Sequence, residues 1–102
     1  YMKPVHRFYF CWSENHYTGE SATSLEEFVE KIKKIDVNSL TFHFYRGDFE
    51  RWVNQAYGET ELAEEIINLR EQNPVGETLR SQLYKIVSKR VEERKAKLPI
   101  PV

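Results

Sequence analysis

Residues 24–35 read Ser-Leu-Glu-Glu-Phe-Val-Glu-Lys-Ile-Lys-Lys-Ile, and this stretch decides the fold class of the chain. Ser24 and Glu27 are spaced as a capping box, in which the hydroxyl accepts from the third helical amide and the carboxylate reaches back to the cap. Acids come early and bases late, as the helix dipole favours. The stretch predicts an amphipathic helix over 24–35. Its apolar stripe consists of Leu25, Phe28, Val29, Ile32 and Ile35.

A second helical pattern begins at Asp48, which the spacing places as an N-cap, and Gly58 ends it. A third pattern follows Thr60. In both, apolar residues return every three or four positions, as on the buried face of a helix. The two apolar sets are Phe49, Trp52, Val53, Ala56 and Tyr57, then Leu62, Ala63, Ile66, Ile67 and Leu69.

The longest helix is expected over about 77–96. An Asn-Pro-Val-Gly break at 73–76 precedes it, and Pro99 and Pro101 end it because proline cannot continue a helix. Its apolar stripe consists of Leu79, Leu83, Ile86, Val87 and Val91.

Residues 37–45 are ambiguous between helix and strand. One apolar set alternates as in a strand, whereas another fits one face of a helix. We interpret the segment as a short helix and keep the strand as the alternative. The alternating set is Leu40, Phe42 and Phe44, and the helical set is Val37, Leu40, Thr41 and Phe44.

The N-terminal segment differs in character from the rest of the chain. Residues 5–12 are rich in aromatics and lack strong helix formers, which predicts an extended segment buried on both faces. Residues 13–23 are small and polar, as expected for a surface loop.

The 102 residues are enough for one ordinary domain. We expect residues 1–102 to form a single, mainly α domain of four to five helices, with α+β as the alternative. The expected parts are an extended segment and loop (1–23), a helical body (24–96) and a flexible tail (97–102).

Composition excludes several classes of protein. Fifteen Lys and Arg against sixteen Asp and Glu give a net charge of −1, which excludes a uniformly basic coat. Cys11 is the only cysteine, so an intrachain disulfide is excluded, and we expect a reducing, cytoplasmic location. We also expect its thiol to be buried. The dense apolar stretch at 8–12 is too short to cross a membrane.

The charge is unevenly distributed along the chain. Residues 77–102 hold seven basic and three acidic residues, whereas residues 1–76 carry a net negative charge. A basic helix is the minimum requirement for nucleic-acid binding, although cations also suit a helix C-terminus. Nucleic-acid binding is therefore an alternative function. Its candidate contacts are Lys85, Lys89, Arg90 and Arg94.

A small-ligand pocket near His43 is a further alternative. The histidine stands beside Tyr45 and Arg46, and His16 is the other candidate for the same pocket. A buried structural histidine is the competing interpretation of His43. No pair of His or Cys shows metal-ligand spacing, so we expect no metal, no cofactor and no catalytic residue.

The aromatic content favours a protein-interaction or regulatory module. Fourteen per cent of residues are aromatic, more than one small core easily buries. We therefore expect a protein partner or self-association through an aromatic surface. Its candidates are Tyr9, Trp12, Tyr17, Tyr45, Trp52 and Tyr57.

Six short motifs give the chain a family likeness. They are Phe-Tyr-Phe at 8–10, Thr-Gly-Glu-Ser-Ala at 18–22 with Ser-Leu-Glu-Glu-Phe at 24–28, Phe-His-Phe at 42–44, Arg-Gly-Asp-Phe-Glu-Arg-Trp-Val at 46–53 and Leu-Ala-Glu at 62–64. In this order they resemble an uncharacterised family of archaeal and bacterial domains of unknown function, over about residues 7–95. The resemblance implies a compact prokaryotic domain that sometimes accompanies enzymes in longer chains. It implies no activity and no catalytic residue.

Overall fold

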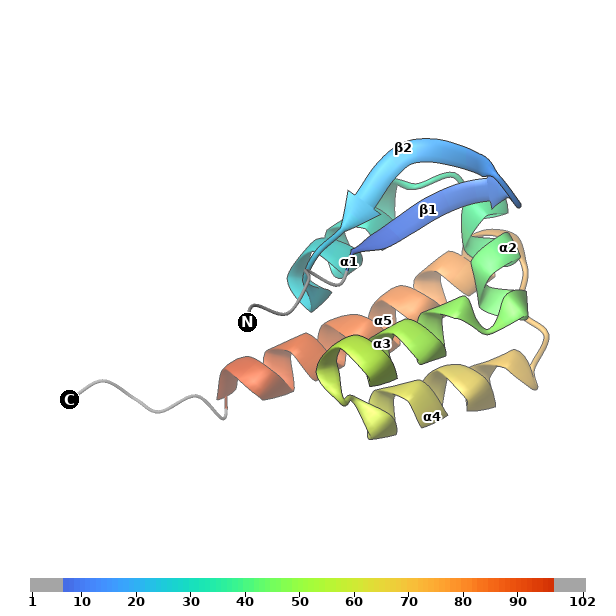
Figure 1. The fold of residues 1–102 in the computed structure, drawn as a ribbon. Helices are drawn as coiled ribbons and strands as arrows, with labels where there is room; N and C mark the ends of the chain where they lie inside the picture. The colour runs from blue at the N-terminus through green and yellow to red at the C-terminus, as the bar shows by residue number, and fades with distance from the viewer. Residues whose placement is uncertain (1–6, 97–102) are drawn as a thin grey trace, which may run out of the picture.

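The computed structural model describes residues 7–96, and these form a two-stranded antiparallel hairpin followed by five helices (Figure 1). The expected mainly α class is confirmed, with the hairpin as its small β component. The ends of the chain, residues 1–6 and the expected tail at 97–102, lie outside the described part. The elements are β1 (Phe8–Ser13), β2 (His16–Ala22), α1 (Leu25–Lys34), α2 (Val37–Arg46), α3 (Asp48–Tyr57), α4 (Thr60–Arg70) and α5 (Gly76–Ala96).

The predicted cap of α1 is present. The Ser24 hydroxyl accepts a hydrogen bond from the Glu27 amide at 3.1 Å. In a capping box the Glu27 carboxylate would accept from the Ser24 amide. Here it accepts instead from the Thr23 amide, one residue earlier, at 2.6 Å. Hydrogen bonds from the Thr23 amide and hydroxyl lower the pKa of Glu27. The helix start is therefore held by two side chains, as its spacing predicts.

The loop expected at 13–23 is wrong, because residues 16–22 form β2 and pair with β1. The burial expected on both faces of the N-terminal segment is also wrong. Phe8 and Phe10 are buried, whereas Tyr9 between them is exposed. The physical reason is that only two strands are present, and no element covers their outer face in the described part of the chain (Figure 1).

A bulge bends β2. Phe10 lies opposite Glu20 and Cys11 lies opposite Tyr17, so Thr18 and Gly19 have no counterpart on β1. Gly19 has φ +92°, a conformation that favours glycine. The Thr18 hydroxyl donates to the Phe10 carbonyl at 2.7 Å and ties the bulge to β1.

The segment 37–45 is helical, as we interpreted it, and lies within α2. Gly47 follows with φ 80° and serves as the N-cap of α3 as well as the C-cap of α2. A side chain there would be strained, and its Cβ would lie 3.0 Å from the Glu50 carboxylate. The prediction of Asp48 as N-cap is therefore wrong, since Asp48 is the first helical residue and its carboxylate bonds elsewhere.

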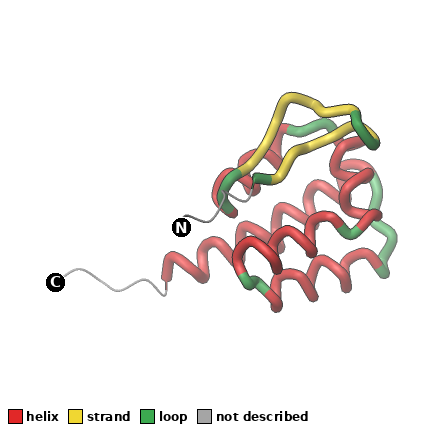
Figure 2. Tube along the Cα trace, in the orientation of Figure 1, coloured by secondary structure: helices red, strands yellow, loops and turns green. Residues whose placement is uncertain are grey.

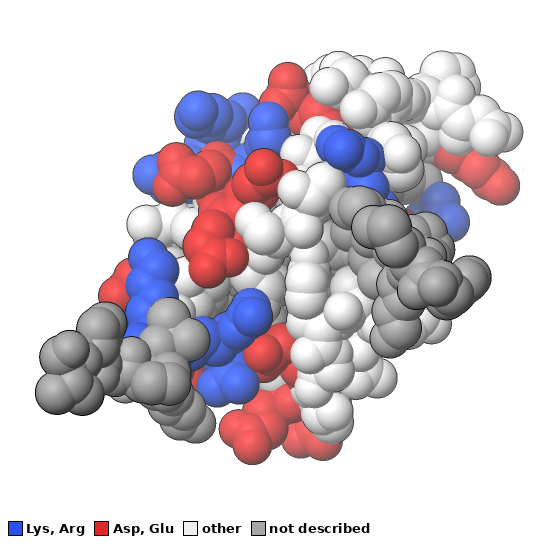
Figure 3. Space-filling view, turned by 60° about the vertical axis from the view of Figure 1, so that its left-hand side comes forward, with Lys and Arg blue, Asp and Glu red and all other residues white. Residues whose placement is uncertain are grey.

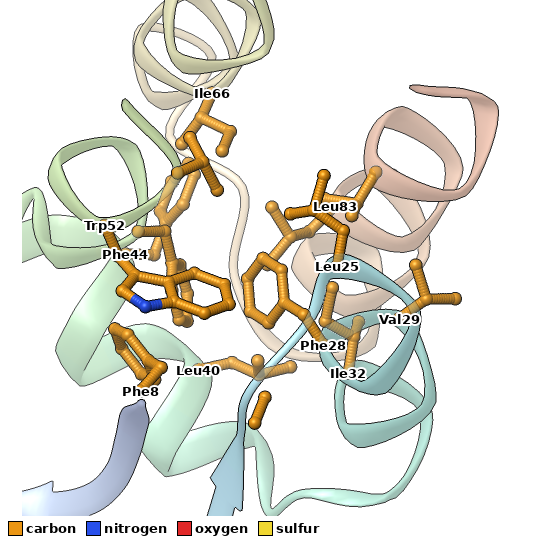
Figure 4. Close-up of a cluster of buried hydrophobic side chains, with 14 of the residues drawn as sticks. Phe8, Leu25, Phe28, Val29, Ile32, Leu40, Phe44, Trp52, Ile66 and Leu83 are labelled. Atoms are coloured by element: carbon orange, nitrogen blue, oxygen red, sulfur yellow. The ribbon is translucent and has the colours of Figure 1, made fainter. Parts of the chain in front are cut away.

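The helices and the hairpin enclose one core. The hairpin lies over α1 and α2, and α5 contacts α1, α2 and α4 (Figures 1 and 2). Phe8 of β1, Phe28 of α1 and Trp52 of α3 point toward one another at the centre of the cluster in Figure 4. The inner face of the hairpin is thereby anchored in the helical body, and its outer face remains in solvent.

Candidate interaction surface

His43 joins three elements through its two ring nitrogens. Its Nε2 accepts a hydrogen bond from the Cys11 amide of β1 at 2.8 Å, and its Nδ1 lies 2.8 Å from Oδ2 of Asp48 in α3. Because Nε2 accepts, the single proton of the neutral ring is on Nδ1 and is donated to Asp48. The ring therefore fixes the edge of β1 against α2 and the start of α3.

Burial keeps this histidine neutral. The side chain is 6% exposed, and desolvation lowers the pKa of His43 below its ordinary value of 6.5. The hydrogen bond and charge of Asp48 oppose this shift, whereas the charge of Arg46 adds to it. A protonated ring would lose its acceptor and, with it, the bond to the Cys11 amide.

Two arginines share the Asp48 carboxylate with His43. Arg51 pairs with Oδ1, and Nε of Arg46 lies 3.6 Å from Oδ2. The Arg46 guanidinium also lies over the Phe42 ring, 4.6 Å from its centroid. Both arginine side chains remain about half exposed. One carboxylate thus holds two cations at the surface beside β1.

The outer face of the hairpin carries exposed aromatic rings. Tyr9 and Tyr17 are 54% and 51% exposed, and their ring centroids lie 5.6 Å apart at an interplanar angle of 75°. Arg7 is exposed and donates to the Ser21 hydroxyl across the strands at 2.8 Å. We call this outer surface of the two strands the hairpin face. Its residues are Arg7, Tyr9, Cys11 and Tyr17.

A model of the Family of unknown function (DUF5752) matches residues 3–99. The chain belongs to this family. The expected resemblance to an uncharacterised family is thereby confirmed. No curated protein and no solved structure matches the chain.

The structure brings together only part of the predicted pocket. His43 and Arg46 meet at Asp48. The Tyr45 hydroxyl instead donates to the Pro74 carbonyl at 2.6 Å, and the His16 ring lies in the hairpin turn, 2.8 Å from the Ser13 hydroxyl. Five surface hollows within residues 7–96 are lined by other residues and by none of these four. The ligand pocket stays a prediction.

The predicted basic contacts on α5 fall into two pairs. Nε of Arg90 donates to the buried Glu59 carboxylate at 2.6 Å, and Nε of Arg94 lies 3.6 Å from the same carboxylate. Lys85 and Lys89 are exposed. On the face shown in Figure 3, basic and acidic side chains are intermingled rather than segregated. Nucleic-acid contact by these α5 residues stays a prediction.

The aromatic residues predicted for an interaction surface do not all lie on one surface. Trp52 belongs to the core, and Tyr57 is half-buried with its hydroxyl donating to the Thr23 carbonyl at 2.7 Å. Trp12 is 46% exposed, but it lines a hollow of about 260 Å³ with Ile35, away from the tyrosine pair. Tyr9 and Tyr17 are the two candidates that contact each other at the surface.

Sequence reasoning missed Arg7 and Cys11 on this surface and Arg51 beside Asp48, and it named Arg46 only for the ligand pocket. Arg7, Tyr9 and Cys11 are spaced two positions apart. If the segment had been expected to bury only one face, this spacing would have placed all three on the other face. Cys11 is half-buried rather than buried as expected. Arg46 and Arg51 gave no such signal, because their position depends on Asp48 and His43.

Among residues 7–96, no three His, Cys, Asp or Glu side chains gather closely enough to hold a metal ion. In the same part of the chain, no helix combines the length and the apolar character that crossing a membrane requires.

Proposed function

We propose that this domain is an interaction module that binds its partner through the hairpin face. The proposal rests on the Tyr9 and Tyr17 pair. Both rings are more than half exposed on the outer face of the hairpin, whereas Phe10 on its inner face is fully buried. Tyrosine and arginine are among the residue types that contribute most of the binding energy at interfaces.

The support beneath this face favours binding. His43 ties β1 to α2 and α3, and Phe8 and Phe10 anchor the inner face in the core. A binding surface gains affinity when its residues are already held in the bound geometry, because less conformational entropy is lost on association. The hairpin face is built on such a support.

A site-specific cross-linker tests the proposal. A benzophenone amino acid replaces Tyr17 in one variant and Ile67 in the other. Ile67 is an exposed apolar residue of α4, 41% exposed, which makes it a matched control. After irradiation in the cells that encode the protein, we expect discrete adducts from position 17 and none from position 67. Protease and nuclease treatment of the adducts then identifies the class of partner.

The proposal is overturned if position 17 gives no adducts, or if both positions give the same ones. Equal labelling would indicate that the aromatic face has no preference over an ordinary exposed site.

A further inference from the structure

The outer edge of β2 offers backbone groups to a further strand. The Cys11 amide points away from β2, because it donates to His43 at 2.8 Å. Residues two apart on a strand point the same way, so the backbone groups of Tyr9 also point away from β2. Ser21 lies opposite Tyr9, and its N–H and C=O therefore point away from β1. No third strand lies beside β2 in the described part of the chain (Figure 2).

This edge of β2 faces the first turns of α1. Thr23 is two positions after Ser21, and its amide donates to the Glu27 carboxylate of α1 at 2.6 Å. A hollow of about 460 Å³ lies here and is lined in part by Ser21 and Thr23. We call it the acidic hollow, because three carboxylates and two cations make up its charged lining. These residues are Arg7, Glu26, Glu27, Glu30 and Lys31.

One carboxylate of the acidic hollow is left over. Lys31 already pairs with Glu20 of β2, and Glu30 pairs with Lys33 at 3.3 Å. Glu26 is exposed and makes no ion pair with any other residue of 7–96. The charge that this carboxylate would accept from a partner is therefore positive.

Glu26 also borders a second hollow, of about 230 Å³, between α1 and α5. Val29 and Val91 supply apolar surface there. Lysine and arginine side chains lay their stems on apolar surface while the charged end reaches a carboxylate. The surroundings of Glu26 thus suit a long basic side chain.

We propose that an extended segment of a partner protein adds to the free edge of β2 as a third strand and places basic side chains in the acidic hollow. Strand addition of this kind takes its affinity from backbone hydrogen bonds and its specificity from alternate side chains. The inference rests on the proposed function and specifies the chemistry of its partner.

The pleat of the sheet determines where the side chains of the added strand lie. The side chain opposite Ser21 lies on the outer side of the sheet, next to the hairpin face. Its neighbours lie on the inner side, where Glu20 of β2 already reaches Lys31 of α1. The inner positions therefore approach Glu26 and Glu30, and we expect lysine or arginine at every second residue.

A nuclear magnetic resonance titration of the full, isotope-labelled chain tests the inference. The probe is an acetylated and amidated peptide of about seven residues, a common strand length, in which lysine and valine alternate. We expect saturable shifts of the amide signals of Ser21 and Glu26. The Ser21 amide should exchange more slowly with solvent, because it gains an acceptor. Affinity should fall as salt rises, since exposed charges are screened.

Methylation of the peptide backbone separates strand pairing from charge attraction. In an extended peptide, successive N–H groups point to opposite edges. Methyl groups on the valine nitrogens block one edge, and methyl groups on the lysine nitrogens block the other, while the charge is unchanged. We expect one methylated peptide to bind and the other to fail. Equal affinities of the two peptides overturn the strand addition.

Glu26→Gln should lower the affinity for the unmethylated peptide about fivefold, the upper range for an exposed ion pair. Glu64→Gln is the matched control, because it removes a carboxylate from an exposed site on α4. It should bind as the unchanged chain does. Circular dichroism confirms that both variants are folded. Equal affinities of the two variants overturn the assignment of Glu26.

The absence of saturable shifts, or shifts confined to α3 and α4, also overturns the inference. If the peptide fails while position 17 still gives protease-sensitive adducts, the inference falls and the proposed interaction module stands. If the peptide binds as expected while position 17 gives no adducts, the proposed role of the hairpin face falls and the edge of β2 remains a binding site.

Discussion

His43 donates through Nδ1 and accepts through Nε2, and this pair of bonds sets its protonation state. The bond to the Cys11 amide spans 32 positions of the chain. The sequence offered a structural histidine and a ligand-pocket histidine as alternatives, and local spacing could not separate them. In the folded chain both nitrogens have protein partners, which favours the structural histidine, and the ligand pocket stays a prediction.

Stability should fall in mild acid because of His43. Its pKa is lowered in the folded state, so between that lowered pKa and 6.5 the unfolded chain binds more protons than the folded one. The stabilisation is complete above about pH 6.5 and is lost as the pH falls through the folded pKa. Urea unfolding at several pH values should show the stability advantage over His43→Gln shrinking in this window.

His16→Gln is the control for that experiment, since His16 lies exposed in the hairpin turn. It removes a histidine while leaving the hydrogen-bond partners of His43 in place. Parallel pH profiles for the unchanged chain and His43→Gln would contradict the assignment.

Ser39 offers a second test at the residue scale. It is fully buried in α2, and its hydroxyl has no hydrogen-bond partner among residues 7–96. Ser39→Ala should raise the free energy of unfolding by about 1 kcal/mol, because an unsatisfied buried hydroxyl is removed. Ser81→Ala, on the exposed side of α5, should change it by about 0.5 kcal/mol at most, through helix propensity alone. A loss of stability in Ser39→Ala would show that the hydroxyl is satisfied.

At the scale of elements, local signals predicted the helices well. The capping residue Ser24, the glycine ends and the apolar stripes all act within one helix, so each is readable from neighbouring positions. β2 was missed because its residues are polar and its stability comes from pairing with β1.

The joint between α3 and α4 is held to α5 by the Glu59 carboxylate, which pairs with Arg90 and more distantly with Arg94. Glu59 is buried, and Arg90 donates to it at 2.6 Å. Arg90→Gln should lower the free energy of unfolding by about 1 to 2 kcal/mol, because it leaves a buried carboxylate short of a charged partner. Chemical denaturation measures this loss against Lys89→Gln, an exposed neighbour that should change stability little. Equal effects would contradict a role for the pair.

At the scale of the whole molecule, the hairpin and the helices share one core. Phe10 is fully buried and packs against Phe28 and His43, so strand and helix lose their packing together. The single domain over 1–102 is a prediction that this packing supports.

Phe10→Ala should cost about 3 to 5 kcal/mol of stability. Unfolding should stay a single transition. Trp12 fluorescence in a Trp52→Phe background follows the hairpin, and far-ultraviolet circular dichroism follows the helices. Coincident transitions are expected, and a hairpin that unfolds before the helices would contradict a shared core.

The sequence by itself determined the helical body, its boundaries to within a few residues, and the family to which the chain belongs. Capping residues, helical periodicity and helix-ending glycines act between neighbouring positions, so they can be recognised from the sequence alone. Only the tertiary structure decided that β2 is a strand and that Asp48 holds two arginines beside His43. Those features require contacts between distant positions, and the packing of the core selects these contacts.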